Sequence, residues 1–149
     1  MEEVLRMEEN QSIFRTVNEI LDREDIAMLS PLQLAYVGDA VYELLVRTYI
    51  LDKNLNVNQL HKKATKYVKA NAQSELIHYI EEYLTEEEKQ IVKRGRNAKT
   101  NTSPKNSSMI DYKYATGFEA LFGYLYLTKQ DGRILTLFDI IKEYENEEI

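Results

Sequence analysis

The stretch LAYVGDAVYELL, residues 34–45, places two acidic residues inside an otherwise apolar run. The residues before it favour a helix start, because Ser30 can serve as N-cap, Pro31 fits the first turn and Gln33 completes a capping box. The helix that follows is apolar on most of its faces, which predicts a central buried position. Burying Asp39 without a partner is costly, since a desolvated carboxylate must find a cation or keep its proton. Asp39 therefore forms an ion pair, caps a neighbouring helix or binds a metal ion, and this stretch alone leaves these interpretations open.

A second stretch, KYATGFEALFGYLYL at residues 113–127, has the same composition: an apolar helix with internal glycines and one embedded acid, Glu119. A glycine inside a helix costs about 1 kcal/mol relative to alanine. Close approach of two helices would offset this cost, because a residue without a side chain lets two backbones draw near. If the helices cross near Gly38 and Gly117, Asp39 and Glu119 meet. Two converging carboxylates without nearby basic residues predict a hard divalent cation with oxygen ligands, most naturally Mg²⁺.

The rest of the chain also has a helical pattern, with two prolines, five glycines and little period-2 alternation, so the predicted fold class is all-α. Helices are expected at about residues 12–23 (with Val17 facing inward), 30–51, 57–69, 72–83, 85–94, 111–127 and 134–144. Gly95 is expected to stop one helix and residues 131–133 to form a turn. Residues 1–10 and 145–149 are expected to fray. Residues 95–110, rich in Gly, Asn, Thr, Ser and Pro, form a long irregular segment, which is usually functional or disordered.

Length and composition narrow the class of protein. The 149 residues suffice for one domain with a real core. The absence of cysteine excludes disulfides, a thiol nucleophile and a Cys-type zinc site. The acidic N-terminus lacks the apolar segment of a signal peptide, and no apolar stretch reaches the ~18 residues needed to cross a bilayer. We therefore expect a cytoplasmic protein with no membrane partner.

The net charge of −6 would repel a polyanion, but the distribution of charge indicates otherwise. Residues 53–74 and 89–110 contain no acidic residue and hold eleven of the nineteen basic residues. They form either two solvated faces that balance the acidic chain ends or a phosphate-binding surface. The residues expected to contact phosphate are Lys62, Lys63 and Lys66 in the first window, and Lys93, Arg94, Arg96, Lys99 and Lys105 in the second. His61 and His78 are isolated and are interpreted as ordinary surface or packing residues, with contact to a nucleic-acid ligand as the alternative.

The segment AYVGDAVYEL resembles the signature of the ribonuclease III family, and TGFEALFGYLYL resembles that family's second acidic helix. With KRGRNAKT between them, the chain is most similar to the compact bacterial branch of the family, Mini-ribonuclease III, over roughly residues 30–128. The resemblance implies one ribonuclease III-like catalytic domain over residues 1–149, without a double-stranded-RNA-binding domain, that acts as a homodimer. It also implies that Asp39 and Glu119 are the catalytic residues and the Mg²⁺ ligands, with Mn²⁺ able to substitute.

The activity that the resemblance implies is endonucleolytic hydrolysis of double-stranded RNA, which leaves 5′-phosphates. The implied substrate is the 23S ribosomal RNA precursor, matured at both ends, with a ribosomal protein on that RNA as a helper. The basic residues of the two windows would then contact RNA phosphates and 2′-hydroxyl groups.

The chain departs from the family pattern at two positions. The family usually has two further acids near the site, and the matching residues here are Ala35 and Thr116. Glu43, one helical turn from Asp39, either compensates in part or faces solvent. The departure leaves an alternative open, a non-catalytic RNA-binding or ribosome-assembly module on the same fold. A small helical protein-interaction domain is a third alternative, in which the basic windows are incidental.

Overall fold

The computed structural model describes residues 13–18, 21–100 and 108–147. Within these ranges the chain forms helices and no strand, which confirms the predicted all-α class. The elements in chain order are the 3-10 helix η1 (Ile13–Asn18), α2 (Arg23–Met28), α3 (Pro31–Ile50), α4 (Val57–Val68), α5 (Ala70–Ile80), the 3-10 helix η2 (Glu81–Tyr83), α6 (Glu86–Arg96), α7 (Met109–Leu127) and α8 (Asp131–Glu147). None of these helices is both long and apolar enough to span a bilayer.

Capping boxes fix where several helices begin. At the start of α3, the backbone N–H of Gln33 donates to Ser30 Oγ at 3.1 Å, and that of Ser30 donates to Gln33 Oε1 at 2.9 Å. Thr85 and Glu88 form the same reciprocal pair at the start of α6, as the sequence predicted. Glu88 also accepts two hydrogen bonds of 2.9 Å from Arg133, which ties α6 to α8. Local sequence therefore sets where these helices begin, and the capping residue Glu88 also joins α6 to α8.

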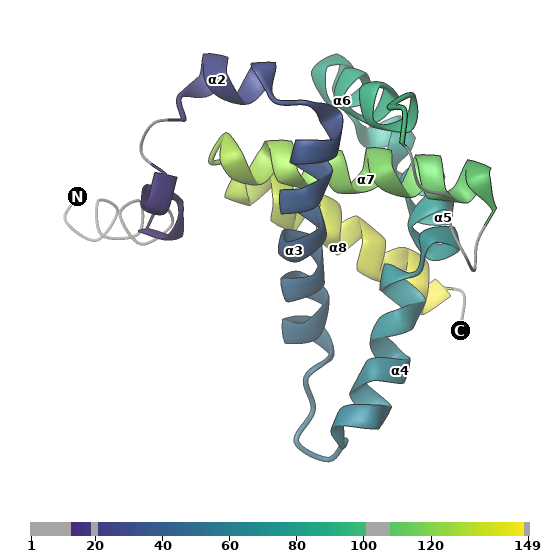
Figure 1. Ribbon diagram of the computed structural model, residues 1–149. Coiled ribbons are helices and arrows are strands. Elements are labelled where there is room, and N and C mark those ends of the chain that lie inside the picture. Colours follow the sequence, from purple (N-terminus) through teal and green to yellow (C-terminus); the bar gives the residue numbers. More distant parts are fainter. Residues whose placement is uncertain (1–12, 19–20, 101–107, 148–149) are drawn as a thin grey trace.

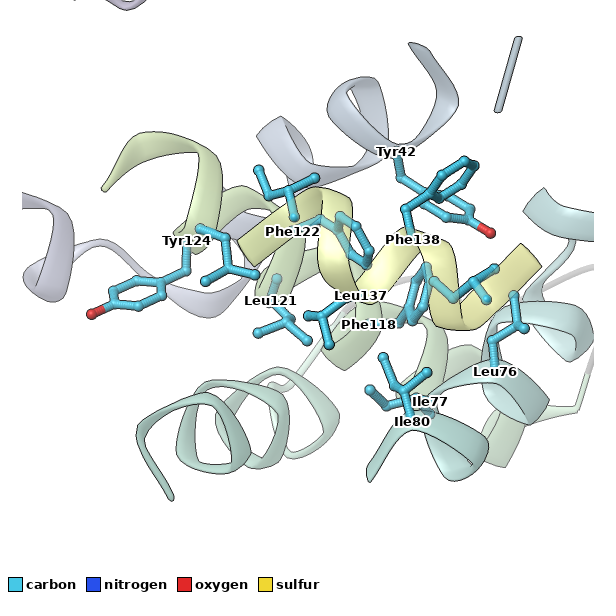
Figure 2. Close-up of a cluster of buried hydrophobic side chains, with 14 of the residues drawn as sticks. Tyr42, Leu76, Ile77, Ile80, Phe118, Leu121, Phe122, Tyr124, Leu137 and Phe138 are labelled. Carbon is cyan, nitrogen blue, oxygen red and sulfur yellow. The ribbon is translucent and has the colours of Figure 1, made fainter. Parts of the chain in front are cut away.

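Helix α7 is the centre of the molecule and packs against α3, α5, α6 and α8. Figure 1 shows α3 crossing α7, with α4 and α5 returning alongside. Tyr42 of α3 packs edge-on against Phe118 of α7, with ring centroids 4.7 Å apart, and Phe122 and Phe138 complete the aromatic cluster (Figure 2). The buried Tyr42 hydroxyl donates to the carbonyl oxygen of Tyr67 at 3.0 Å. The apolar runs that dominate the sequence thus become the core.

Glycines allow the central helices to touch through their backbones. A Cβ atom at Gly38 would overlap the carbonyl oxygen of Glu119, and one at Gly123 would overlap that of Leu34. The helices α3 and α7 therefore cross at Gly38 and Gly123. The prediction that Gly38 crosses α7 at Gly117 is wrong, because Gly117 faces α6. A Cβ atom at Gly95 of α6 would lie 2.7 Å from the Cα of Gly117.

Three predicted boundaries also differ from the structure. Gly95 does not stop α6, which continues to Arg96 because the glycine is used for helix contact. The single helix expected over residues 12–23 is replaced by η1 and α2, and Val17 is 91% exposed rather than inward-facing. The turn expected at residues 131–133 is the first turn of α8. Residues 1–10 and 148–149 lie outside the described residues, while α8 continues through residue 147.

Candidate functional site

The crossing of α3 and α7 brings Asp39 and Glu119 together. Asp39 follows Gly38, which lies directly against the backbone of Glu119. The side chains of the two acids are hydrogen-bonded to each other. Asp39 is exposed and Glu119 is half-buried, so the pair lies at the edge of the core and is open to solvent on one side. The convergence predicted from the two apolar stretches is therefore present, although the glycine pair that permits it differs.

The local electrostatics favour a proton on Glu119. Burial raises the pKa of this carboxyl to about 9, and the hydrogen bond to Asp39 and the negative charges of Asp39 and Glu43 act in the same direction. At neutral pH Glu119 is therefore protonated and donates its hydrogen bond to Asp39. Among the described residues, neither acid forms an ion pair with a lysine or arginine. Glu43 differs, because it pairs with Arg47 at 2.9 Å.

The carboxyl pair fits a hard divalent cation that keeps most of its water. No group of three histidine, aspartate or glutamate side chains suited to a metal ion occurs among the described residues. Ala35 and Thr116 are both buried, and the Thr116 hydroxyl donates to the carbonyl oxygen of Tyr112 at 3.0 Å. Mg²⁺ suits such a site, since it commonly binds one or two carboxylates and completes its shell with water and substrate phosphates. An oxygen-only pair without a resident counter-charge therefore matches this ion's chemistry.

The predicted phosphate-contacting residues of the second window lie at the end of α6. Lys93, Arg94 and Arg96 occupy its last turn, so they are held on a helix rather than in an irregular loop. Lys99 follows as an exposed residue, and Lys105 lies outside the described residues. The Arg96 guanidinium carbon lies 5.6 Å from the centroid of the Tyr114 ring, which fixes its position.

A hollow of about 550 Å³ lies between the end of α6 and the start of α7. Lys99 and Lys113 contribute charge to its lining, and Thr116 lies at the wall one helical turn before Glu119. Lys113 was not among the residues predicted from the sequence. Its spacing of three residues before Thr116 places it on the side of α7 that lines this hollow, and this spacing was the available signal. The hollow can thus hold cationic side chains against an anionic ligand, although neither Asp39 nor Glu119 is among its described lining residues.

The lysines of the first window lie elsewhere. Lys62, Lys63 and Lys66 are exposed on α4, which projects from the end of α3 away from its crossing with α7 (Figure 1). The structure therefore does not place them beside Asp39 and Glu119. They form a separate basic face.

Residues 32–130 match the Ribonuclease III domain model. The chain belongs to the ribonuclease III family. Mini-ribonuclease 3 of Clostridium tetani (strain Massachusetts / E88) is 50% identical to it over 127 residues, or 84% of each chain. Mini-ribonuclease 3 of Thermoanaerobacter sp. (strain X514) is 50% identical over 135 residues, or 90% of this chain and 95% of the relative. A crystal structure of a Fusobacterium nucleatum protein is 38% identical with a TM-score of 0.71, covering 75% of this chain and 92% of that one.

Membership of the ribonuclease III family makes the chain an endoribonuclease, as the sequence predicted. Similarity to Mini-ribonuclease 3 proteins over most of the chain confirms the resemblance to the compact branch. The matched region runs from α3 to α7 and contains both Asp39 and Glu119. The non-catalytic alternatives are therefore set aside, in spite of Ala35 and Thr116.

Proposed function

We propose that the chain is a Mg²⁺-dependent endonuclease that cleaves double-stranded RNA at Asp39 and Glu119. The observation that supports this most strongly is the hydrogen-bonded pair of carboxyl groups that no described cationic side chain neutralises. When bound, Mg²⁺ supplies Lewis acidity for phosphodiester hydrolysis. The two carboxyl groups would hold the ion, and Glu119 would give up its proton on binding it. Mn²⁺ can substitute, since it also prefers oxygen ligands.

The basic side chains at the end of α6 would position the RNA backbone. Double-stranded RNA is recognised mostly by its shape and by contacts to phosphates and 2′-hydroxyl groups. We assign these contacts to Lys93, Arg94, Arg96, Lys99 and Lys105, with Lys113 added by the structure. The lysines of α4 (Lys62, Lys63 and Lys66) would form a second contact surface along a longer duplex.

A homodimer would place two such sites on one duplex. The exposed face of α3 carries Leu32, Tyr36, Ala40 and Leu44 at intervals of four residues, which share one side of a helix. Tyr36 is 83% exposed and Leu44 is 68% exposed, which is unusual for side chains of this size. An apolar hollow of about 730 Å³ continues this face toward η1 and α2. A second copy covering the face would bury this apolar area and leave one carboxyl pair for each RNA strand.

The proposed biological substrate is the 23S ribosomal RNA precursor in the cytoplasm, cut at both ends to leave 5′-phosphates. A ribosomal protein bound to that RNA would assist. This assignment rests on the resemblance to the compact branch of the family, together with the basic surfaces described above.

Cleavage of an end-labelled RNA duplex tests the assignment. The wild-type chain should cut with Mg²⁺ and not with EDTA. Asp39→Asn should lower the cleavage rate by about a hundredfold or more, because the ion's charge stabilisation is worth several kcal/mol. Asp139→Asn, a matched change on the exposed side of α8, should cleave like the wild type. Cleavage by Asp39→Asn at the wild-type rate would contradict the site.

A further inference from the structure

A second groove lies between α5 and α6, with α7 at its base. Its volume is about 160 Å³. His78 of α5, Lys89, Lys93 and Arg96 of α6, and Tyr114 of α7 contribute to its lining. Tyr114 precedes Glu119 by five residues, which corresponds to more than one turn along α7 and a different side of the helix. The groove is therefore distinct from the carboxyl pair.

The groove is basic in an acidic protein. Lys89, Lys93 and Arg96 are spaced by four and three residues, so they project from one face of α6. Of the described residues that line the groove, Glu81 alone is acidic. Lys89 also forms an ion pair with Glu86 at 3.5 Å, which offsets part of its charge. Positive charge thus exceeds negative charge at this groove, although the chain as a whole carries −6.

Tyr114 holds two of the basic groups in place. The His78 and Tyr114 ring centroids are 4.4 Å apart, and the Arg96 guanidinium carbon lies 5.6 Å from the Tyr114 centroid. His78 Nδ1 lies 2.6 Å from the carbonyl oxygen of Ser74 and donates to it, since a carbonyl can only accept. The imidazole orientation is therefore set, and Nε2 is the nitrogen left for a ligand. Groups that are ordered before binding lose less entropy when a ligand arrives.

We infer that this groove binds a backbone phosphate of the RNA substrate, away from the site of cleavage. Arginine bonds phosphate oxygens in pairs, lysines add charge, and His78 Nε2, the acceptor nitrogen of the neutral ring, can accept a hydrogen bond from the 2′-hydroxyl beside that phosphate. The inference rests on the proposed function, which makes RNA the substrate. For His78 it favours the ligand-contacting alternative over the surface or packing role expected from its isolation in the sequence.

Binding of a short RNA duplex without divalent cation tests the groove. Tyr114→Leu removes the ring and leaves every charge in place, so a merely basic surface would bind as before, whereas the groove should bind about three- to tenfold more weakly. Lys89→Ala should weaken binding and lower the slope of log affinity against log salt by about 0.9. Arg23→Ala, on α2, is the control and should change neither quantity. Wild-type affinity in Tyr114→Leu would overturn the inference.

Proton NMR gives an independent test, because its main measurement is made on the wild-type chain and does not depend on a variant that must fold. The chain has two histidines, so His78→Gln assigns the His78 ring signals. These signals should shift on titration with duplex RNA and not with inorganic phosphate at the same phosphate concentration. An unmoved His78 signal, or an equal shift with inorganic phosphate, would overturn the inference while cleavage at Asp39 continued. Failure of the duplex to bind at low salt would instead overturn the proposed function as well.

Discussion

Glu119 shows how one residue combines burial and function. Its carboxyl group lies against α3 because the backbones of the two helices touch at Gly38. Burial then raises its pKa to about 9, helped by the hydrogen bond and charge of Asp39. Because the Glu119 carboxyl must keep its proton in the folded chain at neutral pH, it lowers the stability of the fold compared with a neutral amide at the same position. A bound cation would remove that cost, so stability and metal binding would be linked at this residue.

Glu119→Gln should stabilise the metal-free protein in a pH-dependent way. The folded chain keeps the Glu119 proton up to about pH 9, whereas the unfolded chain loses it near the ordinary value of 4.5. The folded state therefore binds more protons between these values, and the unfolding free energy falls as pH rises. The glutamine variant escapes this loss and should gain more than about 1 kcal/mol at pH 8, since one pKa unit is worth about 1.4 kcal/mol.

Urea unfolding in EDTA at pH 4, 6 and 8 measures this gain. The difference between the variant and the wild type should be small at pH 4 and should grow toward pH 8. Glu82→Gln, on the exposed η2 turn, is the matched control. A difference that is the same at all three pH values would show that Glu119 is not protonated in the folded chain.

At the scale of elements, the crossing of α3 and α7 decides the geometry of the site. Gly38→Ala should destabilise the fold by about 2 kcal/mol or more, because its Cβ atom would overlap the carbonyl oxygen of Glu119 and a packed core cannot yield cheaply. Alanine's better helix propensity, about 1 kcal/mol, is too small to offset this. Gly132→Ala is the control, since no atom lies within 4 Å of a Cβ there. Denaturant midpoints should move in opposite directions, and equal midpoints would contradict a crossing set by Gly38.

The sequence predicts these helices correctly where the determining residues lie within a few positions of one another. The capping boxes at Ser30 and Thr85 and the apolar runs of α3 and α7 are encoded within a few residues. Which glycine meets which helix is not local, because Gly117 and Gly123 lie on the same apolar helix and only tertiary packing assigns one to α6 and the other to α3. Val17 was misplaced because the apolar periodicity near it belongs to a short 3-10 turn.

The candidate site, like the fold, could be predicted from the sequence only in part. The convergence of Asp39 and Glu119 followed from two glycine-containing apolar helices that each carry an acid. The raised pKa of Glu119 could not be predicted from the sequence, since the burial that raises it arises from the packing of separate helices. The groove at His78 was missed for the same reason, because α5, α6 and α7 each contribute part of it.

At the scale of the whole molecule, the exposed apolar face of α3 is the feature that a single chain leaves unexplained. Tyr36→Glu should leave the fold intact, because the side chain is 83% exposed, and should convert a dimer into monomers that cleave poorly. Sedimentation velocity at micromolar concentration measures the change. Tyr83→Glu, on η2, should remain dimeric. A wild-type chain that is monomeric while it cleaves duplex RNA would contradict the proposed assembly.

The central claim is that Asp39 and Glu119 together hold a divalent cation. Titration with Mn²⁺, followed by the loss of its free EPR signal, tests this claim most directly. The wild-type chain should bind Mn²⁺ more tightly as pH rises from 6 to 8, because Glu119 must lose its proton. Asp39→Asn should weaken binding by more than about tenfold, since even residues outside the ligand set contribute that much to metal affinity. Mn²⁺ binding that is unchanged in Asp39→Asn would contradict the claim.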